Sequence, residues 1–299
     1  MRYRPFGRSG KVVSAISLLL RESGAVSSPA AWRATAIAGL ENGINYFELS
    51  ASGEALPIGV GAAISTLERR LVLLGWRIQH QGRVPLTGRS LMDNIQGGLA
   101  RTGAGYFDTL MLDDNAFNCL NRDGHQCLED LKAAGLCKRI GIVGEGDVVD
   151  RCLVAGAFDV LSTSCDVTSD GQVRRRLREA AHQDIIVVAR NPIPTDLIRG
   201  SQLSLGRKAG SFFGLKPRDT LAGVGTFQFL HTTPDWTPED ICLAYLLTEP
   251  TMATVMIEAH KPDIIADWAS VADRELPTGV PAQVEMARFA EEDQPRRRA

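Results

Sequence analysis

Residues 44–54 read INYFELSASGE, an apolar run that ends at the carboxylate of Glu48 and then breaks into small residues. A buried strand that ends at a functional rim has this pattern. Similar short apolar runs recur along the chain, and longer segments with helical periodicity follow them. The expected strands cover residues 15–20, 44–49, 70–76, 109–114, 139–145, 158–164, 184–190 and 253–259.

The intervening segments carry the signals of helices and loops. Helices are expected over residues 28–43, 90–102, 126–135, 147–156, 170–183 and 237–250, and residues 49–60 are expected to form a loop. Strands that are almost entirely apolar are buried on both faces, as in a parallel sheet. Eight strand and helix pairs in 299 residues predict an α/β fold, a single (β/α)8 TIM barrel over residues 1–299.

A doubly wound open sheet is the alternative fold, and it usually carries a glycine-rich loop after its first strand. Residues 20–24 read Leu-Arg-Glu-Ser-Gly, which is not that loop. Within the barrel interpretation, the long connection over residues 191–236 is expected to form a lid over the site. The polar end of the chain, residues 288–299, is expected to be a flexible tail.

Composition excludes several classes of partner. With 44% apolar residues, 23% charged residues and a net charge of −2, the chain shows no electrostatic preference for nucleic acid. No run reaches the roughly 18 apolar residues of a membrane span, and the start of the chain lacks the apolar core of a signal peptide. Six scattered cysteines without a CxxC pair indicate a reducing compartment and no metal site. We therefore expect a cytoplasmic protein with a small-molecule substrate; homo-oligomer formation stays open.

Five segments, taken in order, resemble the aldo-keto reductase family. MRYRPFGRSGKVVSAISL resembles its opening β-hairpin and first strand, AIAGLENGINYFELS a strand that ends in a catalytic Asp, and GYFDTLMLDD a strand that ends in a catalytic His. LEDLKAAGLCKRIGIVGE and VVARNPIPTDLIRG resemble stretches that contact the cofactor. The resemblance implies a (β/α)8 barrel with an N-terminal hairpin and an NADPH-dependent reductase ancestry.

The catalytic groups that the resemblance implies are largely replaced. Family reductases use a Tyr as proton donor, a Lys that lowers its pKa, an Asp that holds the Lys, and a His that orients the substrate. Glu48 stands at the Asp position, and no Tyr follows it among residues 49–60. Gly-Trp at residues 75–76 stands where Thr-Lys is expected, with Arg77 next, and Asp113 stands at the His position. Arginine is a poor substitute for a tuned lysine, so loss of the redox chemistry is predicted.

The cofactor positions are altered as well. Gly144 and Glu145 stand at the Ser-Asn pair that holds the nicotinamide amide, and Cys165 stands at the Tyr that stacks on its ring. Glu145 and Glu258 would add negative charge beside a polyanionic cofactor. We therefore predict no cofactor, and specifically no NADPH binding.

Polar residues at strand ends are the candidate catalytic groups. Glu48 is either a general base, if burial raises its pKa, or an ion-pair partner of Arg77. Neighbours in a strand point to opposite faces, so of Asp113 and Asp114 one faces the site and the other caps the next segment; Asp113 is assigned to the site. Trp76 is either a wall for the substrate or a plug.

The other substrate-binding candidates lie at or just beyond strand ends. They are Leu20, Arg21, His80, Glu145, Cys165, Arg190 and His260. The ordinary interpretation is that an isolated Arg or His is solvated or ion-paired and that a lone Cys is a core residue.

These features favour a cofactor-independent acid/base enzyme, a lyase, isomerase or cyclase, that acts on a largely apolar small molecule in specialised-metabolite biosynthesis. Glu48 or Asp113 would move the proton, Arg77 would set its pKa or hold an oxyanion, and Trp76 would pack the substrate. A non-catalytic binding or scaffold protein is the first alternative. An atypical NADPH-dependent reductase, with its proton from Asp113 or water, is the second.

Overall fold

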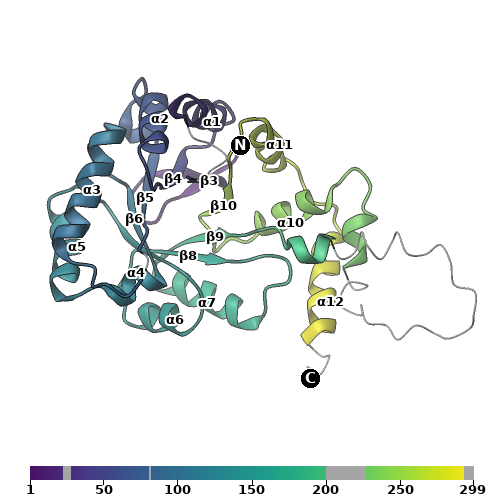
Figure 1. The fold of residues 1–299 in the computed structure, drawn as a ribbon. Helices are drawn as coiled ribbons and strands as arrows, with labels where there is room; N and C mark the ends of the chain where they lie inside the picture. Colours follow the sequence, from purple (N-terminus) through teal and green to yellow (C-terminus); the bar gives the residue numbers. More distant parts are fainter. Residues whose placement is uncertain (23–27, 81, 200–226, 293–299) are drawn as a thin grey trace, which may run out of the picture.

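The computed structural model describes residues 1–22, 28–80, 82–199 and 227–292, and at its centre is a closed barrel of parallel strands (Figure 1). The strands follow one another around the barrel in the order β10-β3-β4-β5-β6-β7-β8-β9. They are β3 (Ile16–Arg21), β4 (Tyr46–Ser50), β5 (Leu73–Ile78), β6 (Thr109–Asp113), β7 (Ile140–Val143), β8 (Val160–Ser164), β9 (Ile186–Arg190) and β10 (Thr254–Glu258). The predicted (β/α)8 barrel is confirmed.

Each predicted strand is present, and the largest shift is in β5. It begins at Leu73, three residues later than expected, because Arg69–Leu71 form a 3-10 turn, η1. The Arg69 guanidinium donates to the carbonyl oxygens of Val72 and Tyr106 at 2.6 Å each, which holds this turn in place. The shift extends β5 to Ile78 and places Arg77 inside the strand.

All six predicted helices are present, and side-chain caps begin several of them. They are α1 (Pro29–Glu41), α3 (Gly88–Thr102), α5 (Arg122–Ala133), α6 (Asp147–Val154), α7 (Gly171–His182) and α10 (Pro238–Leu246). Ser28 caps α1, Thr87 and Ser90 form a capping box on α3, and Thr237 caps α10. These caps satisfy backbone N–H groups that have no partner in the first helical turn.

Further helices in the described part of the chain include α2 (Ala55–Ile64), α4 (Asp114–Cys119), α11 (Asp263–Val271) and α12 (Val280–Glu292). The predicted loop over residues 49–60 is wrong in its second half, because α2 begins at Ala55. The Glu22 carboxylate accepts hydrogen bonds from the backbone N–H groups of Ser52, at 2.7 Å, and Leu56, at 3.4 Å. Pro57 is tolerated because it lies in the first turn, where its missing N–H costs little.

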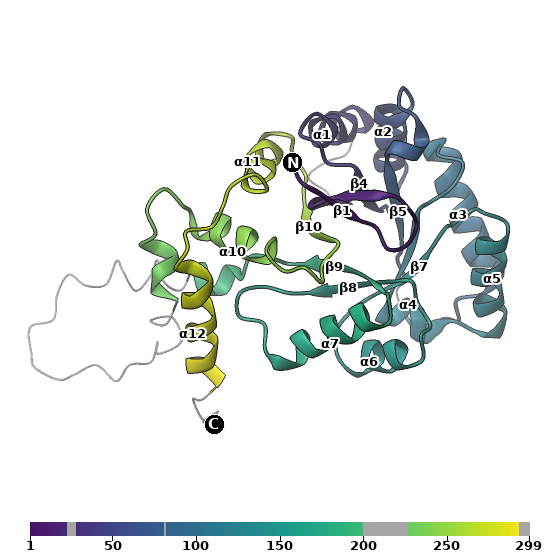
Figure 2. The same ribbon diagram turned by 180° about the vertical axis from the view of Figure 1, so that it is seen from behind.

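The end of the chain is more ordered than predicted. The prediction that a flexible tail begins at residue 288 is wrong, because α12 continues to Glu292. This helix lies outside the barrel beside α10 (Figure 2). Arg288 is buried, and it donates from Nε to the carbonyl oxygen of Val167 at 2.6 Å. Residues 293–299 and most of the predicted lid, residues 200–226, lie outside the described residues, so the lid stays a prediction.

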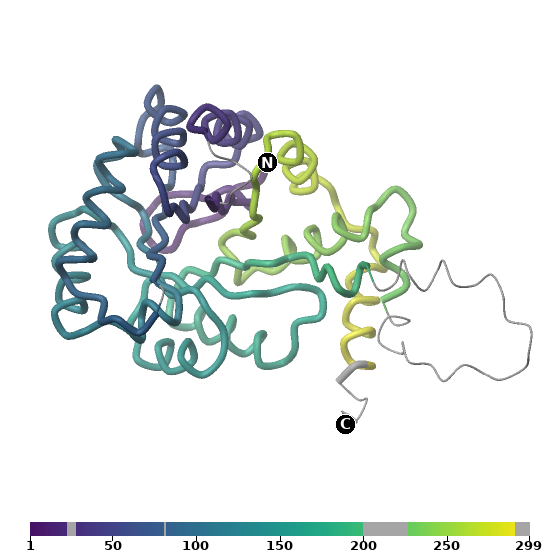
Figure 3. The backbone as a smooth tube through the Cα atoms, viewed as in Figure 1, coloured from purple at the N-terminus to yellow at the C-terminus, as the bar shows by residue number. Residues whose placement is uncertain are grey.

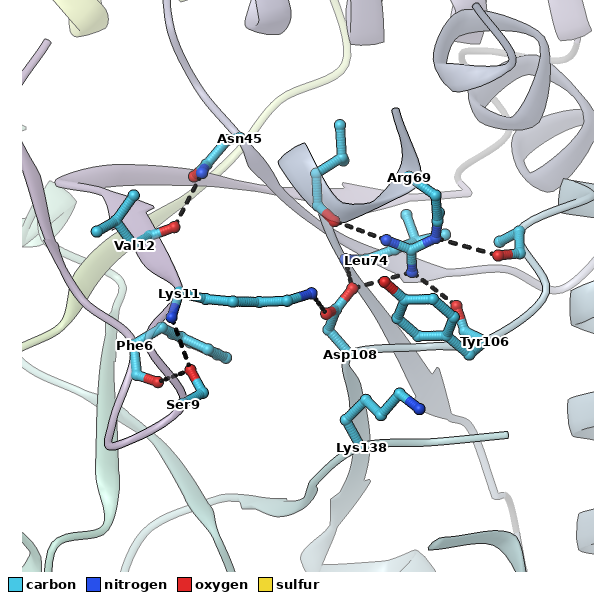
Figure 4. Close-up of polar contacts among 12 residues, drawn as sticks. Phe6, Ser9, Lys11, Val12, Asn45, Arg69, Leu74, Tyr106, Asp108 and Lys138 are labelled. Carbon is cyan, nitrogen blue, oxygen red and sulfur yellow. Dashed lines mark hydrogen bonds and ion pairs between the residues drawn. The ribbon is translucent and has the colours of Figure 1, made fainter. Parts of the chain in front are cut away.

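A hairpin of β1 (Tyr3–Pro5) and β2 (Val12–Ser14) closes the N-terminal end of the barrel. Lys11 reaches from this hairpin to the fully buried carboxylate of Asp108 at 2.7 Å (Figure 4). Asp108 also accepts from Arg69 at 2.9 Å and from the backbone N–H of Leu74 at 3.0 Å. The chain begins beside the segment after α11, where the Met1 ammonium lies 2.7 Å from Asp273 (Figure 3).

Side chains alternate between two cores along the strands. One core fills the barrel interior and includes Leu19, Tyr46, Met111, Val188 and Met256. The other lies between the barrel and the helices, and contains the residues at intervening positions. This alternation decides which residues at the strand ends face into the barrel.

Candidate functional site

Polar side chains gather at the carboxyl ends of the strands, which we call the mouth. Because Leu19 and Met111 face the barrel interior, Arg21 and Asp113, two residues further on, share that face. The same alternation places the following residues at inward positions of the mouth: Arg21, Glu48, Arg77, Asp113, Glu145, Ser162, Ser164, Arg190 and Glu258. Active sites of (β/α)8 barrels lie at this end.

Glu48 and Arg77 form a buried ion pair on neighbouring strands. Nε of Arg77 donates to Oε1 of Glu48 at 2.6 Å, and Nη2 contacts the same oxygen. The two side chains are 0% and 6% exposed. Gly75 makes room for this arrangement, because a Cβ there would lie only 2.6 Å from Oγ1 of Thr109. Of the two roles left open for Glu48, general base or ion-pair partner of Arg77, the structure shows the ion pair.

A phenol does lie beside Glu48, but it belongs to Tyr46 and faces the barrel core. Its hydroxyl is 2.9 Å from Oγ1 of Thr109 and 3.5 Å from Oε2 of Glu48. Burial, and then the negative charge of Glu48, raise the pKa of Tyr46 well above its usual value of 10.0. A phenol was expected only among residues 49–60, whereas Tyr46 lies two residues before Glu48 in the same strand and therefore shares its face. Tyr46 is inaccessible and has no route to a substrate.

A second ion pair lies between the first and last strands of the barrel. Nε of Arg21 is 3.3 Å from the carboxylate of Glu258, and Nε2 of His260 is 3.2 Å from the same carboxylate. The edge of the His260 ring packs against Trp32, at a centroid distance of 6.4 Å. We call β10, β3, β4 and β5, with these two ion pairs, the paired half of the mouth.

Asp113 and Asp114 have the reverse of their predicted roles at the start of α4. Asp113, at an inward position, accepts from the backbone N–H of Ala116 at 2.7 Å and is the N-cap of α4. The prediction that Asp114 would be the cap is therefore wrong. The Asp114 carboxylate lies over the end of β7, where it occupies the space that a Cβ on Gly144 would need. Its Oδ1 is buried without a hydrogen-bond partner among the described residues.

The electrostatic surroundings favour the neutral form of Asp114. Burial raises its pKa above the ordinary value of 3.8, and the neighbouring charge of Asp113 raises it further. The backbone of Glu145 and the charge of Arg190 act in the opposite direction. Asp114 follows the inward residue Asp113 and lies over Gly144, so its carboxyl group is at the rim of the mouth, where burial raises its pKa.

Arg190 ends β9 with little compensation for its charge. Its nearest carboxylate oxygen, Oε1 of Glu145, is 4.0 Å from Nη2. Its Nε, like Oγ of the neighbouring Ser162, is buried with no hydrogen-bond partner among the described residues. Burial, and then the positive charge of Arg77, lower the pKa of Arg190. We call β6, β7, β8 and β9 the unpaired half of the mouth.

Three of the predicted substrate contacts point away from the mouth, so their assignment is wrong. Trp76 packs between β5 and α3, where Nε1 donates to Oδ1 of Asn94 at 2.7 Å. Leu20 and Cys165 belong to the same helix-facing core. Burial raises the pKa of the Cys165 thiol to about 11, so this thiol is protonated at neutral pH.

His80 is committed to its own loop, because its Nε2 is 2.7 Å from the carbonyl oxygen of Val84. His80 and the three residues above were assigned to the site only because they lie at strand ends. Trp76, Leu20 and Cys165 face the helices, because side chains alternate between the two faces of a strand.

A cavity of about 810 Å³ lies at the opposite end of the barrel, between the N-terminal hairpin and the starts of β9 and β10. Arg4 lines it, but its guanidinium already donates to the carbonyl oxygens of Glu249, at 3.1 Å, and Met252, at 2.7 Å. Barrel enzymes do not place chemistry at this end. The mouth is therefore the candidate site.

Comparison with known proteins agrees with this architecture. The model of the Aldo/keto reductase family matches residues 20–288. The chain belongs to the aldo/keto reductase family. Two solved structures of an aldo-keto reductase from Bacillus halodurans are similar in fold. The holo form has a TM-score of 0.72 at 16% identity and the apo form 0.70 at 17%, and each comparison covers 96% of both chains. A search of curated proteins found no match.

The residues at the nicotinamide positions do not fit that group. Cys165, where the family has a stacking Tyr, faces the helices and is buried. Gly144, where the family has a Ser, is covered by the Asp114 carboxylate. A carboxylate offers no donor to a nicotinamide carbonyl unless it is protonated.

Within residues 1–22, 28–80, 82–199 and 227–292, no cluster of three metal-binding side chains occurs. None of the helices described is both long and apolar enough to cross a membrane.

Proposed function

We propose that this aldo/keto reductase family member is a cofactor-independent enzyme that performs acid/base chemistry, as a lyase, isomerase or cyclase, on a small molecule at the mouth. The observation that carries the proposal is the ion pair of Glu48 and Arg77. By resemblance these residues stand in the region of the Asp and Lys that would tune a phenol. Here they satisfy each other at 2.6 Å in a buried position, and neither is free to tune a proton donor.

No tyrosine replaces the missing phenol. The chain has four tyrosines, and all lie in the described residues. Tyr3 and Tyr106 are at the N-terminal end of the barrel, Tyr46 is in its core, and Tyr245 on α10 donates to Glu285 on α12 at 2.5 Å. Hydride transfer to a carbonyl needs a proton donor at the carbonyl oxygen, so the redox reaction lacks its usual partner.

Asp114 is the proton-carrying group in this proposal, in place of Glu48 or Asp113. Glu48 is held by Arg77, and Asp113 is engaged as a helix cap. Asp114 has a buried oxygen without a partner among the described residues and a raised pKa, which are the properties of a general acid. A largely apolar substrate is not carried forward, because Trp76 and Leu20, on which that expectation depended, face the helices.

Two experiments test this proposal. The first is titration with NADPH, followed by fluorescence, together with assays of NADPH oxidation with aldehydes and ketones. We expect neither saturable micromolar binding nor oxidation. Saturable binding with carbonyl-dependent oxidation would establish the atypical reductase instead.

The second experiment compares the wild-type protein with Asp114→Asn in a cell-extract metabolite mixture without added nicotinamide cofactor. We expect untargeted mass spectrometry to show a metabolite that only the wild type converts. If the wild type retains a small molecule without converting any, the binding or scaffold function replaces the enzymatic one. A conversion that Asp114→Asn performs at the wild-type rate would exclude Asp114 as the proton-carrying group.

A further inference from the structure

We infer that the unpaired half of the mouth is a binding site for the carboxylate of a small-molecule ligand, and that Arg190 is the group that holds it. This inference deepens the proposed function by naming the substrate class. It does not require turnover, because binding is measured directly.

Three arginines at inward positions of the mouth differ in how closely a carboxylate approaches them. Arg77 has a carboxylate oxygen at 2.6 Å and Arg21 has one at 3.3 Å. Arg190 has its nearest at 4.0 Å, which is beyond hydrogen-bond distance. A charged donor that is buried without a partner carries a desolvation penalty. Arg190 is thus the arginine of the mouth whose charge is least compensated by the described residues.

The geometry of the guanidinium indicates how an anion would bind. Nε and Nη2 form one edge of the group, and two parallel hydrogen bonds from such an edge match the two oxygens of a carboxylate. In Arg190, Nε has no partner among the described residues and Nη2 has only the distant Glu145. Glu145 is 55% exposed and can swing into solvent, which would open this edge. Glu145 therefore acts as a weak internal competitor for the ligand.

Neighbouring groups limit the charge of the ligand. The charge of Arg77 lowers the pKa of Arg190, and the charges of Glu48 and Glu145 raise it, so both signs of charge surround this guanidinium group. Asp113 and Glu145 occupy inward positions at the ends of β6 and β7, and the charges of both act on Asp114 at the rim. A phosphate dianion would meet stronger repulsion from these groups than a carboxylate. Ser162, on the strand next to β9, adds a buried hydroxyl without a partner among the described residues.

The test is titration of the full-length protein with benzoate, acetate, neutral benzamide and inorganic phosphate. The Nε–Hε signals of ¹⁵N-labelled arginine report binding, and calorimetry gives Kd. We expect the two carboxylates to shift one arginine signal that is missing from Arg190→Gln, and benzamide to shift none. Glu145→Gln should bind benzoate about tenfold more tightly, because the competitor is removed. Arg190→Lys should bind more weakly than the wild type, since it keeps the charge without the two-pronged edge.

Arg8→Gln is the matched control. It removes one positive charge at the opposite end of the barrel, where Arg8 pairs with Asp184 at 2.5 Å, and it should bind benzoate like the wild type. Absence of carboxylate binding, or equal binding by Arg190→Gln, overturns the inference. Binding of phosphate more tightly than of either carboxylate overturns the assigned ligand class. Carboxylate binding without any turnover would support this inference and would contradict only the proposed reaction.

Discussion

The two halves of the mouth treat their charges differently. In the paired half, Arg77 and Arg21 each face a carboxylate within hydrogen-bond distance. In the unpaired half, Arg190 and Asp114 keep buried polar atoms without partners among the described residues. Within the described part of the chain, buried atoms without a hydrogen-bond partner also occur in or beside the paired half, at Ser17, Trp32, His260 and Nη2 of Arg77. The contrast therefore concerns ion pairs, because this Nη2 contacts the Glu48 carboxylate.

The difference is the basis for the proposed position of the reactive groups on this barrel. By resemblance, the catalytic Asp and Lys of the reductases map to the ends of β4 and β5, which belong to the paired half. Glu48 now stands at the Asp position and Trp76 at the Lys position, and the next residue, Arg77, neutralises Glu48. Two charged groups without a close partner of opposite charge among the described residues, Asp114 at the start of α4 and Arg190 at the end of β9, lie in the other half. Under the proposed function, the reactive groups would therefore lie at a different part of the rim on the same set of strands.

The largest expected effect comes from breaking the buried pair of the paired half. Glu48→Gln leaves the Arg77 charge buried with a neutral neighbour, which typically costs about 3–5 kcal/mol. Urea unfolding followed by circular dichroism measures the free energy of unfolding. The matched variant replaces both partners, with Glu48→Leu and Arg77→Met, and should recover most of the loss because no charge remains buried. A loss of less than about 1 kcal/mol in Glu48→Gln would mean that water reaches Arg77.

The fold was largely predictable from the sequence because its strands are continuous apolar runs. The first turn of α2 was not, because Glu22, distant in sequence, accepts from the N–H groups at its start. The pairing of Glu48 with Arg77 was predicted from their places on adjacent strands. Trp76 and Cys165 were misassigned because strand-end position was considered without the alternation of faces.

The unpaired half was harder to predict than the paired half. Whether Arg190 has a partner depends on distances between side chains from separate strands, and local sequence patterns do not determine such distances. The exchange of roles between Asp113 and Asp114 has a similar origin. It depends on α4 beginning directly after β6, with no intervening loop. The sequence shows that Asp113 and Asp114 are carboxylates at a strand end, but it does not show which of them caps α4.

A smaller effect is expected from the second ion pair of the paired half. Arg21→Gln removes a contact between two side chains that are each about two-fifths exposed to solvent. Pairs of this kind contribute about 0.2–1 kcal/mol, so the free energy of unfolding should fall by no more than that. The same urea measurement applies, and added salt should reduce the difference from the wild type. If the free energy of unfolding falls as much in Arg21→Gln as in Glu48→Gln, the two ion pairs of this half are equally shielded from water.

The smallest effect, and the most specific to the unpaired half, is the pH dependence of Asp114→Asn. The pKa of Asp114 is raised in the folded protein, so folding favours its protonated form. That contribution to stability is fully present below the unfolded pKa, near 3.8, and is lost as the pH rises through the folded pKa. Asparagine does not titrate. The stability of Asp114→Asn relative to the wild type should therefore increase with pH from about 4 upward and then level off. Urea unfolding at a series of pH values measures this slope, and a decrease over the same range would mean that Asp114 is stabilised as the carboxylate, as a group of the paired half would be.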